Sequence, residues 1–367
     1  MDVKPQFDEF LKGIRLTEHQ VDDLKRGHST LRDRLWADTG LKPILVSDFL
    51  QGSYRRYTAV RPKDGKRADV DVVVVTNLDE RAYSPQQAMD LFRPFLDQHY
   101  KGKWRFQGRS IGIELSYVDL DIVLTSAPSE IVRKAVLSES VRNDSALDEL
   151  FESFVLKEAV GQREPAWKSS PLRIPDRDAK AWDDTDPLAQ MRKTWDKNKD
   201  TGGLYVNVVK AIRWWRRINP EPPHPKGYPV EHLVYLACLK DIDSVADGVT
   251  RSLEGIVSAY ALYAAAEQTP FVPDHGVPGH NVLGRVSGAD FKKFHETVST
   301  AAKLARVALE APTIKESCDK WRELFGQQFP GPPTQDRGGP GGGRGGSRTG
   351  GYTVPAAPSV PRTERFA

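Results

Sequence analysis

The stretch DVDVVVVT, residues 69–76, decides the fold of this chain. Its residues are β-branched almost throughout, which predicts a buried strand. Side chains two apart in a strand point to the same face, so Asp69 and Asp71 present two carboxylates side by side, while the alternating valines face a core. Two Mg²⁺ ions are one way to offset the repulsion between such carboxylates. A strand end capped by two surface carboxylates is the simpler alternative, and the Asp-x-Asp pattern alone favours it.

A short turn, Gln51-Gly52-Ser53, precedes this strand. Glycine lets the backbone approach a phosphate closely, and the serine adds a hydroxyl donor. A Gly-Ser pair is also an ordinary turn, so its value lies in the order: a hydrophobic run, Gly-Ser, then Asp-x-Asp on a strand. Several positive residues lie between Arg55 and Arg67, just after the turn. They suit a ligand with several phosphates better than a long duplex.

A third carboxylate is expected from a strand predicted at 110–125. The odd positions from 113 to 123 of this strand would share one face, and Asp119 and Asp121 are among them. Acidic residues in an apolar strand are costly unless they are paired or bind a metal. We expect Asp121 to complete a three-carboxylate site, because it directly precedes the Ile-Val-Leu run. Asp119 is the alternative, and otherwise a neighbour of the site.

Basic residues recur on a later helix, in the segment KAIRWW that begins at Lys210. Lys210 and Arg213 lie three residues apart, so on a helix they share a face and could both reach a triphosphate. A basic stripe beside buried tryptophans is also common on any amphipathic helix. The helix therefore supports a phosphate site only in combination with the carboxylates.

The remaining pattern predicts a mixed α/β unit followed by helices. Residues 1–40 are expected to be helical with a Thr17–Gln20 capping box, and a strand or short helix is expected at 44–46. An amphipathic helix over 84–100 should begin at Ser84 and bend at Pro94. Further elements are expected as a strand at 103–107 and as helical runs at 188–216, 229–241, 247–267, 290–311 and 321–329.

Composition limits the class of protein and indicates where its regions begin and end. Hydrophobic residues make up 39% of the 367 residues, no apolar run approaches the ~20 residues of a membrane span, and the net charge is +3. Two cysteines, Cys238 and Cys318, form no disulfide framework, which favours a reducing, cytoplasmic location without membrane association. We expect an N-terminal helical spine, a core, a helical C-terminal domain and a disordered Gly/Pro-rich tail, at residues 1–40, 41–185, 186–330 and 331–367.

These features together resemble the polymerase-beta-like nucleotidyltransferases. The segments FLQGSYRRYTAVRP, RADVDVVVVTNLD, GRSIGIELSYVDLDIVLTSAP and PKGYPVEHL are similar to those of the CD-NTases, clade D in particular. CD-NTases are bacterial relatives of cyclic GMP-AMP synthase and oligoadenylate synthase, found in CBASS anti-phage operons. The resemblance covers nearly the whole chain. It implies an α/β plus all-α fold: a nucleotidyltransferase core with a mixed sheet, joined in a bilobal arrangement to an oligoadenylate-synthase-like helical domain.

The resemblance also implies roles for individual residues. The metal-binding acids, for two Mg²⁺ or Mn²⁺ ions, match Asp69, Asp71 and Asp121. The turn that holds the donor phosphates matches Gln51, Gly52 and Ser53, and the basic pair that contacts a nucleoside triphosphate matches Lys210 and Arg213. Where oligoadenylate-synthase-like relatives often carry Ser or Gln, this chain has Gly227, so only the following Tyr228 is carried over, as a base-stacking residue.

The implied activity is the synthesis of a cyclic di- or trinucleotide second messenger from ATP and other nucleoside triphosphates, most consistent with an adenine-containing cyclic trinucleotide. Implied partners are a ubiquitin-activating-like enzyme that conjugates the chain at Ala367, or a HORMA-type regulator, and a downstream effector activated by the product. Template-independent addition of nucleotides to RNA is the alternative activity, and an inactive scaffold is a third possibility. Asp274 to His280 could suggest a metal site, but a locally hydrogen-bonded loop is the better interpretation.

Overall fold

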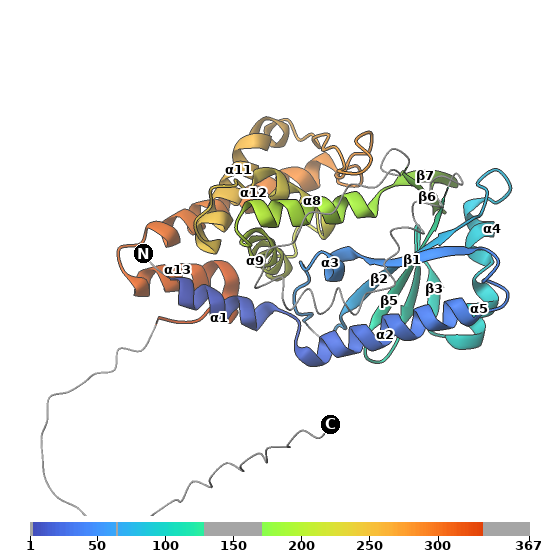
Figure 1. Cartoon of the computed structure of the whole chain (residues 1–367). Helices are drawn as coiled ribbons and strands as arrows, with labels where there is room; N and C mark the ends of the chain where they lie inside the picture. The colour runs from blue at the N-terminus through green and yellow to red at the C-terminus, as the bar shows by residue number, and fades with distance from the viewer. Residues whose placement is uncertain (1–2, 64, 128–170, 333–367) are drawn as a thin grey trace, which may run out of the picture. The chain divides into compact units, whose positions relative to one another are not determined.

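The computed structural model describes residues 3–63, 65–127 and 171–332 (Figure 1). Up to Pro332 the chain forms a single compact unit. Most of the predicted tail, Ala367 included, and the segment 128–170 within the predicted core lie outside the described residues.

Two helices begin the chain, α1 (Lys4–Ile14) and α2 (Glu18–Ala37). The predicted capping box starts the second: the Thr17 hydroxyl accepts from the Gln20 amide at 3.2 Å, and the Gln20 side chain accepts from the Thr17 amide at 3.0 Å. This cap satisfies amides that would otherwise lack a partner at the helix start. The helical prediction for residues 1–40 is therefore confirmed as two helices with a break before Thr17.

A mixed sheet follows, as predicted, with seven strands in the described residues; the two strands between residues 172 and 185 were not predicted from the sequence. Its order is β1-β2-β5-β4-β3, with β6 pairing with β5 and β7 with β6. β2 and β5 run parallel and every other pair is antiparallel. The strands are β1 (Leu45–Gln51), β2 (Asp69–Thr76), β3 (Trp104–Phe106), β4 (Ile111–Glu114), β5 (Asp119–Ser126), β6 (Leu172–Asp176) and β7 (Ala181–Thr185).

The prediction of a single strand over residues 110–125 is wrong. It is a hairpin of β4 and β5, closed by a hydrogen bond from the Leu115 amide to the Val118 carbonyl at 3.0 Å. Of the residues that usually mark a turn in a sequence, this turn contains only Ser116 and no Gly, Pro, Asn or Asp, so its signal is weak. The odd positions before the turn therefore do not share a strand face with Asp119 and Asp121, although these two still share one within β5.

The two faces of β2 contact different cores. Val70, Val72 and Val74 are buried with residues of α2, α4 (Pro85–Asp90) and α5 (Arg93–His99), which confirms the predicted core face. Val73 and Val75 belong to a smaller cluster on the opposite face. Because alternation is strict, Asp69 and Asp71 share the face of Val73 and Val75.

The helix predicted at 84–100 begins at Ser84 as expected, but it consists of two helices. Ser84 caps α4 by accepting from the Gln87 amide, and Pro85 lies in the first turn. The interruption falls at residues 91–92, so that Pro94 lies in the first turn of α5, where its missing N–H costs nothing.

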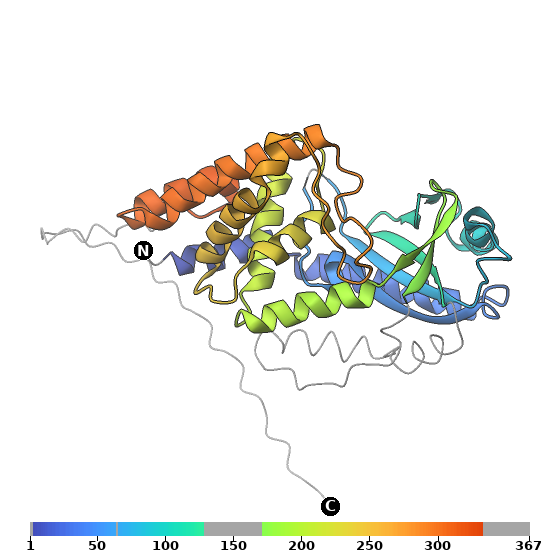
Figure 2. The ribbon, with the colours of Figure 1, turned by 90° about the horizontal axis from the view of Figure 1, so that it is seen from above.

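Helices make up the rest of the described chain: α8 (Pro187–Asp200), α9 (Tyr205–Ile218), α10 (Tyr228–Ala237), α11 (Val245–Ala265), α12 (Gly288–Glu310) and α13 (Ile314–Phe325). Figure 2 shows the orange α12 and α13 packed with the yellow α11, apart from the strands. Helix α1 joins this group, since Phe7 contacts Trp321 at a centroid distance of 4.9 Å and Phe10 stacks on Phe325 at 4.6 Å. The N-terminal region thus contributes α1 to the helical core and α2 to the sheet.

Candidate active site

The three predicted carboxylates lie on the two central parallel strands. In the register of β2 and β5, Asp69 is beside Asp119 and Asp71 is beside Asp121. Parallel strands in this register place Asp69, Asp71 and Asp121 on one face at the same end of the sheet.

Burial and mutual repulsion raise the pKa values of two of these acids. Burial, with the charges of Asp69 and Asp121, raises the pKa of Asp71 to about 7. Burial and the charge of Asp69 also raise the pKa of Asp121. The basic and hydrogen-bonding neighbours of these two acids do not offset burial and repulsion, so the cluster favours a bound cation.

The Gly-Ser turn lies directly against this cluster. Gln51 pairs with Asp71 in the β1–β2 ladder, and the short helix α3 (Gly52–Arg55) begins at the next residue. Gly52 has φ +78°, and a Cβ there would lie 1.7 Å from Asp71 Oδ2. Only glycine fits both the backbone conformation and this close approach. The turn therefore brings backbone groups of Gly52 and Ser53 beside the acids.

Asp119 and Asp121 have different surroundings. Arg67 donates its Nε hydrogen to Asp119 Oδ1 at 2.8 Å, so the charge of Asp119 has a guanidinium partner. Asp121 Oδ1 instead accepts from Gln107 Nε2 at 3.0 Å, and Gln107 Oε1 accepts from the Ser110 hydroxyl at 3.1 Å. These surroundings favour Asp121 as the third acid and Asp119 as its neighbour.

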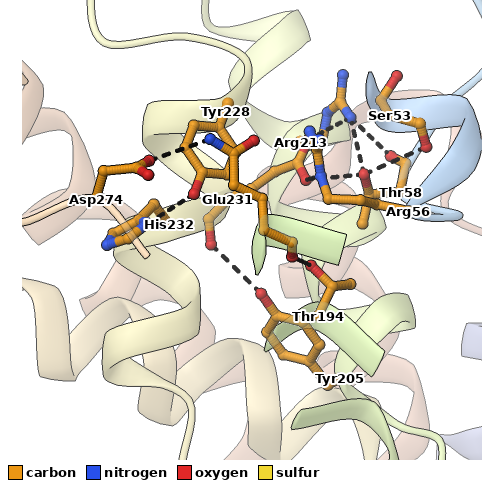
Figure 3. Close-up of polar contacts among 11 residues, drawn as sticks. Ser53, Arg56, Thr58, Thr194, Tyr205, Arg213, Tyr228, Glu231, His232 and Asp274 are labelled. Carbon is orange, nitrogen blue, oxygen red and sulfur yellow. Dashed lines mark hydrogen bonds and ion pairs between the residues drawn. The ribbon is translucent and has the colours of Figure 1, made fainter. Parts of the chain in front are cut away.

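Arg213 takes part in a buried ion cluster centred on Glu231 of α10 (Figure 3). Its Nη1 lies 2.6 Å from Glu231 Oε1 and also donates to the Thr58 carbonyl at 3.0 Å. Arg56 Nε donates to Glu231 Oε2 at 3.1 Å, and the Thr58 hydroxyl donates to the same oxygen at 2.9 Å. The cluster joins two helices to the loop that follows the Gly-Ser turn, because the Thr58 amide donates to the Ser53 carbonyl. We call Arg56, Thr58, Arg213 and Glu231 the Glu231 cluster.

The structure separates Lys210 from Arg213. Lys210 is buried, and burial together with the charge of Arg15 lowers its pKa to about 7. Arg213 instead acts electrostatically on Asp71. Arg217, one turn further along α9, was not selected from the sequence. Burial and the charge of Arg213 lower its pKa, while Asp69 opposes this, so Arg217 faces the acids as well.

Tyr228, the predicted base-stacking residue, lies at the edge of the Glu231 cluster. Arg56 Cζ lies 5.0 Å from its ring centroid, and its hydroxyl is 3.2 Å from His232 Nδ1. The interpretation of 274–280 as a locally hydrogen-bonded loop is confirmed, since Asp274 Oδ1 accepts from the Gly276 amide at 2.9 Å.

The carboxylates have the donor chemistry that a hard divalent cation requires. Within residues 3–63, 65–127 and 171–332, no three Asp, Glu, His or Cys side chains already converge as a metal site. Asp69, Asp71 and Asp121 nevertheless offer only oxygen donors, and a cation would offset the burial and relieve the repulsion that together raise the pKa of Asp71. These residues therefore fit a magnesium-type ion.

None of the helices in the described ranges is long and apolar enough to cross a membrane.

Comparison with known proteins identifies relatives along the whole chain. Residues 1–125 match the family described as the Second Messenger Oligonucleotide or Dinucleotide Synthetase domain. The chain is 44% identical, over 390 residues that cover 100% of both proteins, to the cyclic AMP-AMP-GMP synthase of Enterobacter hormaechei subsp. hoffmannii. It is 29% identical over 335 residues, 90% of this chain and 86% of the relative, to the cyclic AMP-AMP-AMP synthase of an Acinetobacter species.

A solved structure shows the same fold. The CdnC protein of E. coli MS115-1, solved with ATP, has a TM-score of 0.62 at 16% identity, covering 89% of this chain and 99% of its own. The mixed sheet with a helical C-terminal region is thus the nucleotidyltransferase fold expected from the sequence.

Proposed function

Since this chain belongs to the CD-NTase family of bacterial nucleotidyltransferases, we propose that it joins ATP and GTP into a cyclic trinucleotide containing two AMP units and one GMP unit. The observation that supports it most is the 44% identity along the full length to a cyclic AMP-AMP-GMP synthase, combined with three carboxylates beside a Gly-Ser turn. The product would act as a second messenger in anti-phage defence and activate a separate effector.

Asp69, Asp71 and Asp121 would hold two Mg²⁺ ions, or Mn²⁺ in their place. When bound, such ions lower the pKa of an attacking ribose hydroxyl and stabilise the leaving pyrophosphate. Their carboxylates lie on adjacent strands of the rigid sheet, so their separation is set before substrate binds.

The remaining residues position the substrates. The backbone of Gly52 and Ser53 receives the donor phosphates, and Arg213 and Arg217 supply positive charge from α9. Lys210, the other predicted basic residue, is buried against Arg15 and is not part of this proposal. Asp121 accepts the proton of the attacking hydroxyl. Gln107 Nε2 donates to its Oδ1 and would help to orient the carboxylate for this task. Tyr228 stacks on a base.

Addition of nucleotides to RNA requires the same acids, so the two activities need a direct test. Purified protein is incubated with labelled ATP, GTP and Mg²⁺, with and without an RNA primer, and the products are treated with phosphatase. We expect a small phosphatase-resistant product that forms without primer. Extension of the primer, with no small product, would support the RNA activity instead.

Gly52→Ala tests the turn. The new Cβ would displace the Asp71 carboxylate, and a displacement of about 1 Å in a catalytic group can lower turnover by about a hundredfold. Gly102→Ala is the matched control, because Gly102 also has positive φ, +71°, but nothing lies within 4 Å of its added Cβ. Each variant should lose ~1–3 kcal/mol of stability to backbone strain. Equal turnover in the two variants would show that the turn does not support catalysis.

A further inference from the structure

The backbone of the Gly-Ser turn is held by the segment that follows it. The Ser53 carbonyl accepts two hydrogen bonds, from the Thr58 amide at 2.9 Å and from the Ala59 amide at 3.0 Å. The Gly52 carbonyl accepts from the Arg56 amide at 3.0 Å. A backbone carbonyl has two lone pairs, so these two amides use the full acceptor capacity of Ser53. The orientation of the peptide group that follows Ser53 therefore depends on where residues 58 and 59 lie.

This segment contains a strained residue and so needs an anchor. Tyr57 lies between Arg56 and Thr58 and has φ +62°, in the left-handed region that costs free energy for a residue with a β-carbon. Such a conformation persists where surrounding contacts fix the residues on either side. Without those contacts we expect Tyr57 to return to negative φ, which would move both of its neighbours.

Glu231 of α10 supplies contacts on both sides of Tyr57. Its Oε2 accepts from Arg56 Nε at 3.1 Å and from the Thr58 hydroxyl at 2.9 Å (Figure 3). All three residues are buried, so water does not compete for these hydrogen bonds. Burial alone would raise the pKa of Glu231, but the charges of Arg56 and Arg213 and its hydrogen bonds lower it. The carboxylate is therefore ionised, which strengthens each hydrogen bond that it accepts.

We propose that Glu231 is a positioning residue for the Gly-Ser turn, which it holds from the helical part of the protein through Thr58 and Arg56. The path is continuous, because Glu231 binds the Thr58 hydroxyl and the Thr58 amide binds the Ser53 carbonyl. The inference rests on the proposed function, since it assumes that this turn receives the phosphates of a nucleoside triphosphate. It adds that a helix 173 residues away from Thr58 sets the geometry of the phosphate site.

Hydrogen exchange in the nucleotide-free, full-length protein tests the positioning, followed by mass spectrometry of peptides that cover residues 52–59. Thr58→Val removes the hydroxyl that binds Glu231 and keeps the β-branched shape of the side chain. We expect the amides of Thr58 and Ala59 to exchange at least about tenfold faster in this variant, because the segment that carries them opens more often. Thr58→Ser keeps the hydroxyl and should exchange at nearly the wild-type rate.

Thr250→Val is the matched control for this substitution. Thr250 and Thr58 are both 0% exposed, but the Thr250 hydroxyl donates to the Ala246 carbonyl within α11, at 2.9 Å. Its loss should leave exchange at residues 52–59 unchanged.

The consequence for the substrate is measured by calorimetry with Mg²⁺ and α,β-methylene ATP, an analogue that cannot be cleaved between its first two phosphates. We expect Thr58→Val and Glu231→Gln each to bind it at least about tenfold more weakly than the wild-type protein. Both substitutions act on the same hydrogen bond, so the double variant should lose less affinity than the product of the two single effects. Thr250→Val should bind the analogue as the wild type does.

The outcomes separate the inference from its premise. Unchanged exchange at residues 52–59 in Thr58→Val would overturn the positioning role, as would an equal rise in Thr250→Val, which would indicate a general loosening of the fold. Wild-type affinity in Thr58→Val beside a loss in Glu231→Gln would also overturn it, because the loss would then act through Arg213 alone. No binding of the analogue by the wild-type protein would overturn the proposed function itself. If Glu231→Gln does not fold, the Thr58 variants decide, since neither of them changes a charge.

Discussion

Replacing Asp71 by Asn should lower turnover at least about a thousandfold, because a neutral amide cannot replace an anionic ligand at the point where the cluster is most buried. The measurement is the initial rate of pyrophosphate release from ATP and GTP at saturating Mg²⁺. Asp119→Asn is the matched control: Asp119 lies on the neighbouring strand, two residues before Asp121 on the same face, but pairs with Arg67. It should retain turnover within about tenfold of wild type.

The same Asp71→Asn protein should be no less stable than the wild type. In the wild-type protein the folded-state pKa of Asp71, about 7, is above the ordinary value of an aspartate. The folded wild-type protein therefore loses stability as the pH rises from about 4 to about 7 and this carboxylate ionises. The amide never ionises and avoids this loss. Thermal melting at pH 8 without metal should therefore show an equal or higher Tm. If the variant is inactive and also unfolded, misfolding explains the loss of turnover. Full turnover in the variant would contradict the assignment of Asp71 to the active site.

Glu231→Ala should cost about 3–5 kcal/mol of unfolding free energy, because it leaves the buried guanidinium of Arg56 and the mostly buried one of Arg213 without a counter-ion. The side chains of Arg56 and Glu231 are 6% and 5% exposed, so water cannot replace the lost partner. Urea unfolding followed by circular dichroism measures this cost.

Glu254→Ala provides the comparison for that measurement. Glu254 pairs with Arg306 at 2.6 Å, but the two side chains are 38% and 37% exposed. Exposed pairs contribute at most about 1 kcal/mol. Similar losses in the two variants would show that the Glu231 cluster is no more important to stability than a surface ion pair.

Short-range patterns in the sequence predicted the parts of the site that depend on one element. The alternation of Asp and Val in 69–76 predicted the strand, its core face and the shared face of the two acids, all of which the structure confirms. The Thr17–Gln20 capping box is equally local, since its hydrogen bonds join residues three apart.

Parts that depend on packing between elements could not be predicted. Gln107 reaches Asp121 only because β4 lies between β3 and β5 in a particular register. Glu231 gave a weak signal, a single carboxylate within the apolar helix YPVEHLVYLA, but its arginine partners are 18 and 175 residues away. Spacing along one helix also could not show that Lys210 faces Arg15 while Arg213 and Arg217 act on the acids.

The most direct test of the central claim is the mass of the product. Purified protein is incubated with all four ribonucleoside triphosphates and Mg²⁺ or Mn²⁺, and the phosphatase-resistant material is identified by mass spectrometry, with the Asp69→Ala, Asp71→Ala double variant as the blank. We predict the mass of a cyclic trinucleotide of two AMP units and one GMP unit, absent from the blank. No resistant nucleotide product, or the same product from the double variant, would contradict the account.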